Sequence, residues 1–150
     1  MENAQAASST VSLPTRVAAG IAGGLVGGVG FGILMQAMGM LPMVADLIGS
    51  DSTGVGWLVH LFNSALFGAI FVLLFFRWIG DLGPAAVLGL IYGAAWWLIG
   101  ALWIMPAWLG MSEMIFEIGD AQWQSFVGHL FYGLLLAVTY LLIVPRMERR

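Results

Sequence analysis

The sequence predicts an all-α integral membrane protein, a four-helix bundle built from two tandem two-helix repeats with both ends on the cytoplasmic side. Hydrophobic residues make up 61% of the 150-residue chain and charged residues 9%, whereas charged residues approach a quarter of a soluble domain. Four long apolar stretches carry no charge, and several scarce residues recur at a constant spacing. A chain of this length forms one domain, so residues 1–150 are expected to be a single transmembrane unit.

The four apolar stretches are residues 17–40, 55–76, 84–105 and 124–144. A helix rises about 1.5 Å per residue, so each stretch is long enough to cross a hydrocarbon core of roughly 30 Å. In lipid the backbone must satisfy its own hydrogen bonds, which helices do, and the alternating pattern of barrel strands is absent from the sequence. The sequence therefore predicts four transmembrane helices.

Two connections on one side of the bundle, residues 42–49 and 107–119, are predicted to be short amphipathic segments at the outer surface. In the second connection apolar residues recur at helical spacing, while Glu113 and Glu117 share the opposite face. Such a pattern is typical of a short helix that lies flat on the membrane surface. An ordinary apolar loop packed over the bundle is the alternative.

The charges predict the orientation of the bundle. All five basic residues fall on one side, and the full outer connections between the apolar stretches, residues 41–54 and 106–123, carry no charged residues other than acids. By the positive-inside rule the arginine side is cytoplasmic, so we expect a multi-pass protein of a prokaryotic cell membrane with both termini in the cytoplasm. A net charge of −3 without any lysine excludes nucleic acid as an expected partner. The arginines are Arg16, Arg77, Arg146, Arg149 and Arg150, and the acids are Asp46, Asp51, Glu113, Glu117 and Asp120.

The two halves of the chain resemble each other. When the sequence is shifted along itself by one constant number of residues, an aspartate, a histidine and an arginine each align with a residue of the same type. A slightly smaller shift aligns two glycines with two other glycines. Because each half holds two crossings, the copies should be related by an axis along the membrane normal; chance similarity between leucine- and glycine-rich helices is the alternative. The larger offset matches Asp51 with Asp120, His60 with His129 and Arg77 with Arg146, and the smaller one matches Gly24 with Gly89 and Gly28 with Gly93.

Small residues recur at every fourth position along the predicted helices. They let helix backbones approach closely, which is how bundles gain packing energy in lipid. A groove or pore lined by glycine is the alternative, but it needs polar groups that are scarce in the four stretches. The positions expected to pack helices together are Gly24, Gly28, Ser64, Gly68, Gly89, Gly93 and Gly133.

His60 and His129 are the strongest candidates for binding a cofactor. Each lies a few residues inside the outer end of its helix, on the face that carries the small residues. A symmetric pair of histidines on facing helices is what bis-histidine ligation of haem b requires. Binding of a transition metal, chiefly Cu(I), is a second hypothesis because methionines crowd the same rim. The candidate metal ligands are His60, His129, Met35, Met38, Met40 and Met43.

The leading expectation is nevertheless that no cofactor is bound. A neutral imidazole can donate to a nearby backbone carbonyl and have no further role, and methionine commonly fills apolar cores. The chain has no cysteine, which excludes disulfides and thiolate metal sites. The four stretches hold no acid or arginine, so general acid–base hydrolysis and proton-coupled antiport lack their usual groups. We therefore expect no enzyme.

Two runs, GWLVHLFNSA at residues 56–65 and GHLFYG at residues 128–133, resemble small four-helix membrane proteins of halophilic archaea and some bacteria that are grouped as domains of unknown function. The resemblance supports a membrane protein with an internal repeat and implies no activity. The expected function is a non-enzymatic subunit, or an assembly or stability partner, of a membrane complex, or a homo-oligomer. Its partners would be the lipid bilayer and itself or another membrane protein. A haem b- or copper-binding protein for electron transfer or metal handling is one alternative, and an oligomeric channel or exporter of a small solute is another.

The lack of cysteine permits a labelling test of the orientation. We predict that Ser112→Cys reacts with a membrane-impermeant thiol reagent in whole cells and that Arg150→Cys does not, because the arginine side is cytoplasmic. Permeabilised cells, in which both positions should react, provide the control. Labelling at position 150 but not at position 112 of intact cells would reverse the orientation.

Overall fold

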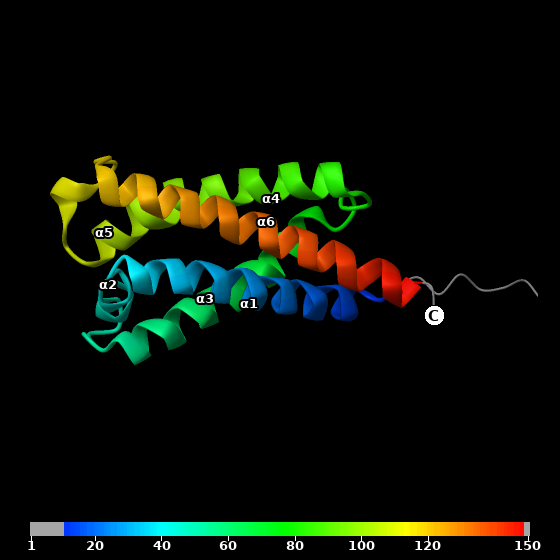
Figure 1. Cartoon of the computed structure of the whole chain (residues 1–150), viewed down its shortest axis with the longest axis horizontal. Helices are drawn as coiled ribbons and strands as arrows, with labels where there is room; N and C mark the ends of the chain where they lie inside the picture. The colour runs from blue at the N-terminus through cyan, green and yellow to red at the C-terminus, as the bar shows by residue number, and fades with distance from the viewer. Residues whose placement is uncertain (1–10, 149–150) are drawn as a thin grey trace, which may run out of the picture.

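The computed structural model describes the backbone of residues 11–148 and the side chains of residues 11–144. Within these residues all regular secondary structure is helical (Figure 1). Four spans of the described chain are long and apolar enough to cross a membrane: Leu13–Ala37, Thr53–Phe75, Leu82–Trp108 and Asp120–Val144. The prediction of an all-α bundle is confirmed, and its four long apolar helices are compatible with a membrane protein.

Three of the spans are single helices: α1 (Leu13–Ala37), α3 (Thr53–Phe75) and α6 (Asp120–Glu148). The third span begins as α4 (Leu82–Trp96), continues as the π-helix η1 (Trp97–Ile104) and ends as α5 (Met105–Trp108). The outer connections contain α2 (Leu41–Asp46) and the 3₁₀ turn η2 (Ser112–Met114). Each span begins two to four residues before its predicted start.

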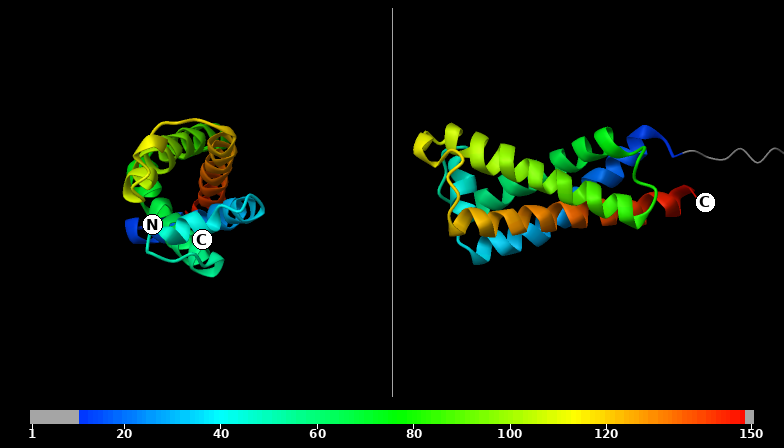
Figure 2. Two further views of the ribbon diagram at one scale, coloured as in Figure 1. Left: turned by 90° about the vertical axis from the view of Figure 1, so that its left-hand side faces the viewer. Right: turned by 90° about the horizontal axis from the view of Figure 1, so that it is seen from above.

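The four spans pack as a row in the order α3, α1, α6, α4. Helix α1 packs along both α3 and α6, and α4 packs along α6. Seen end-on, the row curves back on itself (Figure 2). Its two ends meet through aromatic side chains: Phe67 of α3 stacks on Trp96 of α4 with ring centroids 3.8 Å apart, and the Tyr92 hydroxyl donates to the Phe67 carbonyl oxygen at 2.7 Å.

Glycine determines which helices lie close together. Helix α1 carries two glycine faces, and a Cβ atom added to Gly24 on the first face would overlap the carbonyl oxygen of Ser64 on α3. A Cβ atom added to Gly27 on the second face would lie 2.7 Å from the carbonyl oxygen of Tyr132 on α6. Such distances are too short for any side-chain carbon, so α1 can lie between two neighbours only because glycine occupies both faces.

The interface between α4 and α6 is built in the same way. A Cβ atom on Gly89 would overlap the carbonyl oxygen of Gly133, and one on Gly93 would overlap that of His129. All seven positions singled out for helix packing lie at the α1–α3 and α4–α6 interfaces. They are Gly24, Gly28, Ser64, Gly68, Gly89, Gly93 and Gly133.

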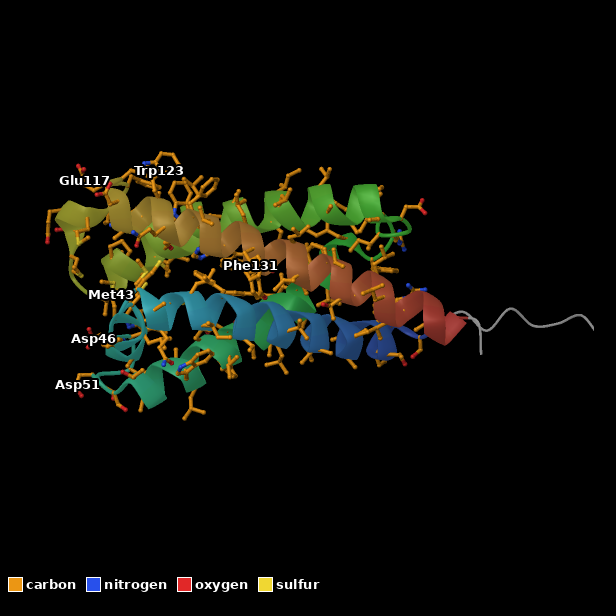
Figure 3. The ribbon with its side chains drawn as sticks, in the orientation of Figure 1. Met43, Asp46, Asp51, Glu117, Trp123 and Phe131 are labelled. Atoms are coloured by element: carbon orange, nitrogen blue, oxygen red, sulfur yellow. The ribbon has the colours of Figure 1, made fainter. Side chains whose placement is uncertain are left out.

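The two ends of the bundle differ in charge. The start of α1 and the end of α6 lie at one end (Figure 1), where the Arg16 and Arg77 guanidinium groups both lie over the Phe76 ring, 5.8 and 5.6 Å from its centroid. Met43, Asp46, Asp51, Glu117 and Trp123 lie at the opposite end (Figure 3). The side chain of Arg146, and Arg149 and Arg150 as whole residues, fall outside the described residues.

The second outer connection differs from the helix expected over residues 107–119. Helix α5 ends at Trp108, and Gly110 follows with φ +72°. Pro106 has no N–H to bond the Leu102 carbonyl oxygen one turn earlier. The backbone N–H of Phe116 donates to that oxygen instead, at 3.0 Å, and Phe116 has φ 59°. The proline and the glycine thus break the helix, and the returning chain closes the open end of the third span.

The packing analysis predicts unequal effects for two glycine substitutions in the third span. Gly93→Ala should destabilise the protein because its methyl group would meet the backbone of α6. Gly100→Ala should be tolerated, since the added carbon would lie 3.6 Å from the Trp96 side chain, an ordinary van der Waals distance. Thermal unfolding in detergent, followed by circular dichroism, measures both. Equal tolerance at the two positions would contradict the close α4–α6 contact.

Candidate functional site

The two histidines lie on either side of one phenylalanine, Phe31 of α1. The ring centroid of Phe31 is 5.4 Å from that of His60 and 4.8 Å from that of His129, and both contacts are edge-on. Phe31 also fills the space beside Gly128, where a Cβ atom on α6 would overlap its ring. Three helices therefore contribute to one aromatic cluster, which we call the Phe31 cluster: Phe31, His60 and His129.

His60 is held by a hydrogen bond between helices. Its side chain is 8% exposed, and its Nε2 atom lies 2.9 Å from the carbonyl oxygen of Gly28 on α1. A carbonyl oxygen can only accept, so Nε2 carries the proton and Nδ1 keeps its lone pair. The close glycine contact between α1 and α3 brings this carbonyl within reach. His60 is seven residues from the start of α3, about 10 Å along the helix.

His129 is held within its own helix. Its Nδ1 atom lies 2.8 Å from the carbonyl oxygen of Ser125 and 3.3 Å from the Ser125 hydroxyl oxygen. The same reasoning places the proton on Nδ1, which leaves the lone pair on Nε2. The side chain is half-buried. The two imidazoles thus share a neighbour but present different nitrogen atoms, so their hydrogen bonding is not symmetric.

The methionines proposed as metal ligands are divided between the interior and the surface. Met35 is buried in the core. Met38 and Met40 are partly buried and pack against the core. Met43 is 42% exposed and lies on α2 at the outer end of the bundle (Figure 3). In the part of the chain that the structure describes, no group of three or more His, Cys, Asp or Glu side chains is placed to hold a metal ion.

Other polar side chains inside the bundle also bind backbone carbonyl oxygens. The hydroxyl of Tyr132 on α6 donates to the carbonyl oxygen of Ser64 on α3 at 2.7 Å, and the Ser64 hydroxyl donates to that of His60 at 2.7 Å. The Trp97 indole donates to the Gln122 carbonyl oxygen at 2.9 Å. Within the described side chains, every fully buried nitrogen or oxygen atom has a hydrogen-bond partner. The interior is therefore a set of satisfied polar contacts in an apolar bundle.

Two residues of the site were not expected from the sequence. Phe31 is an isolated aromatic residue between Gly30 and Gly32, and this change of size in a glycine-rich helix is the signal that could have identified it. Tyr132 directly precedes Gly133 and bonds across to α3. Its partner could not be inferred, because the backbone carbonyl that a tyrosine reaches depends on helix packing.

Comparison with protein-family models, curated proteins and solved structures finds no match for this chain.

The geometry predicts unequal effects when each histidine is replaced by leucine. His60→Leu removes a hydrogen bond between α3 and α1, whereas His129→Leu removes one within α6. Interhelical bonds in membrane proteins contribute about 0.6 kcal/mol on average and up to about 1.7 kcal/mol, so His60→Leu should lower stability more. Unfolding of both variants in detergent provides the measurement. A larger loss for His129→Leu would contradict the assigned bonding.

Proposed function

We propose that this chain is a non-enzymatic membrane protein that acts as a subunit, or as an assembly or stability partner, of a larger membrane complex, or that assembles with itself. The observation that carries the proposal is the use of interior polar groups to bind backbone carbonyl oxygens. His60, Ser64, Tyr92, Tyr132 and Trp97 all do so. All of these bonds except that of Ser64 join different helices, and such bonds are typical of a rigid bundle.

The placement of charge supports a cell-membrane location with both termini cytoplasmic. Arg16 and Arg77 share the end at which the described chain starts and finishes, and the acids Asp46, Asp51 and Glu117 lie at the other end. An excess of arginine marks the cytoplasmic side of bacterial membrane proteins. The bilayer is thus the first partner of the chain, since its four spans present large apolar side chains outward.

Equivalent contacts support the proposed internal repeat. Gly24 meets the Ser64 carbonyl oxygen at the α1–α3 interface, and Gly89 meets the Gly133 carbonyl oxygen at the α4–α6 interface. The smaller sequence offset relates Gly24 to Gly89, and the larger one relates Ser64 to Gly133. A duplicated helix pair accounts for the same contact arising twice.

The two proposed copies differ at the second glycine face. The offset that relates Gly24 to Gly89 also relates Gly23 and Gly27 of α1 to Leu88 and Tyr92 of α4. These larger side chains keep α4 from approaching α3 as closely as α1 approaches α6, so the two ends of the row meet through aromatic side chains and not through close backbone contact. The duplication proposal therefore explains both the shared contacts and the asymmetry.

Haem b or copper binding is the second candidate function, and one observation favours it. His60 and His129 each donate from one ring nitrogen to a backbone carbonyl and keep the lone pair on the other. Histidine ligands of metals are held in this way, because the outer bond fixes the tautomer and the ring orientation. A haem between the two rings would have to replace Phe31, which contacts both. A single histidine with nearby methionines would suit Cu(I) without that displacement.

A channel or exporter of a small solute is the third candidate. The described interior of one chain is packed with aromatic and aliphatic side chains around satisfied polar groups. A polar path would therefore have to form between chains of an oligomer. This candidate shares its requirement for assembly with the leading proposal.

Purification from native membranes in a mild detergent tests the proposal. We predict a particle several times heavier than a single chain, measured by light scattering with correction for bound detergent. The same sample should lack a Soret band and stoichiometric copper. A monomer of one chain would contradict the subunit and homo-oligomer proposals. A Soret band, or about one copper per chain, that is lost in a His60→Ala/His129→Ala variant would establish the second candidate instead.

A further inference from the structure

The side-chain amide of Asn63, which has no hydrogen-bond partner among the described residues, lies near the middle of its span. Asn63 is ten residues after the first residue of α3 and twelve before the last, so it lies about 15 Å from the outer end of the helix. Its side chain is half-buried. Among the described side chains and backbone, no hydrogen bond joins the Asn63 amide to another group, and its polar atoms are not fully buried.

The bilayer makes this amide unusual. An amide needs a hydrogen-bond donor for its oxygen and acceptors for its two N–H groups, and neither water nor lipid tails provide them in the hydrocarbon core. The backbone can meet only part of this requirement: its carbonyl oxygens can still accept from the amide N–H groups, but its N–H groups are already bonded and cannot donate to the amide oxygen. A hydroxyl is easier to satisfy: Ser64, the next residue, donates to the carbonyl oxygen of His60 one turn earlier.

Asn63 belongs to an apolar stripe along α3. Spacings of four and three residues alternate along this stripe, which is the repeat of two helices that wind around each other in a left-handed manner. Val59 and Ile70 pack in part against the core, but every member is half-buried or exposed, so the chain itself covers the stripe only partly. We call it the α3 stripe; it consists of Val59, Asn63, Leu66, Ile70 and Leu73.

We propose that two copies of the chain pair through the α3 stripe, with the two Asn63 amides hydrogen-bonded to each other. This inference rests on the proposed assembly function and specifies its partner and surface. Copies inserted in one orientation can be related by a two-fold axis along the membrane normal, which places each Asn63 at the depth of the other. An amide both donates and accepts, so two amides at one depth satisfy each other. A single asparagine in an apolar heptad stripe also fixes register and the number of chains.

Cross-linking through cysteine tests the pairing, because the chain contains no cysteine of its own. Leu66 in the α3 stripe is 46% exposed, and Val26 on α1 is the matched control position at 47% exposed and a similar depth. After oxidation in native membranes, Leu66→Cys should form a disulfide-linked dimer and Val26→Cys should not. Equal cross-linking of the two variants would overturn the proposal.

The role of the amide is tested in the Leu66→Cys background. Asn63→Leu should weaken dimerisation roughly 3- to 20-fold, the range expected for an interhelical hydrogen bond in a membrane, while Asn63→Gln should retain much of it. Circular dichroism and thermal unfolding of the monomer show whether Asn63→Leu still folds. An unchanged dimer in a folded Asn63→Leu variant would overturn the proposal.

The outcomes separate this inference from the assembly function. A heavy native particle that contains other proteins, together with no Leu66→Cys dimer, would reject self-pairing and leave the subunit role intact. A native particle with the mass of a single chain, together with no Leu66→Cys dimer, would reject both proposals.

Discussion

The close approach of α1 to two neighbours is the constraint on which the rest of the structure depends. Lipid tails are as apolar as leucine, so burial of hydrophobic surface does not draw helices together in a membrane. Close contact between helix backbones must hold the helices together instead. Helix α1 makes such contacts on two faces, through Gly24 and through Gly27. The row of helices, the reach of His60 to the Gly28 carbonyl oxygen and the position of Phe31 all follow from this arrangement.

The polar side chains provide directional bonds between helices. Tyr132 joins α6 to α3 and His60 joins α3 to α1, so two bonds tie three helices at nearly one level. Tyr92 joins α4 to α3, where the two ends of the row of helices meet. A hydrogen bond in a low-dielectric interior is costly to leave unmade, so these bonds favour one arrangement of the helices over its alternatives. Asn63 is the exception on α3, and for this reason its amide points to a contact outside the chain.

The number and the approximate limits of the spans could be predicted because length and hydropathy report directly on the bilayer. The small-residue positions were also visible, since glycine recurs every fourth residue along a helix. Which glycine faces which helix was not visible, because Gly23 and Gly24 look alike in sequence yet contact α6 and α3 respectively. The contact between α3 and α4 depends on how each helix is rotated about its own axis. The periodicity of residues in the sequence does not determine this rotation. In the candidate site, the histidines could be identified because histidine is scarce in this chain. Which ring nitrogen of each histidine keeps its lone pair could not be predicted, because it depends on the position of the nearest backbone carbonyl.

The second glycine face of α1 has a consequence for the order of biosynthesis. The first face meets α3, which the ribosome completes at Phe75, whereas the second waits for Tyr140 of α6, near which Gly23 lies. At roughly 5–20 residues per second the interval is roughly 3–13 s. During that time the face of the first hairpin that carries Gly23 and Gly27 lacks the helix that packs against it in the finished fold. In a membrane, lipid or an insertion factor would cover this face until the last helix arrives.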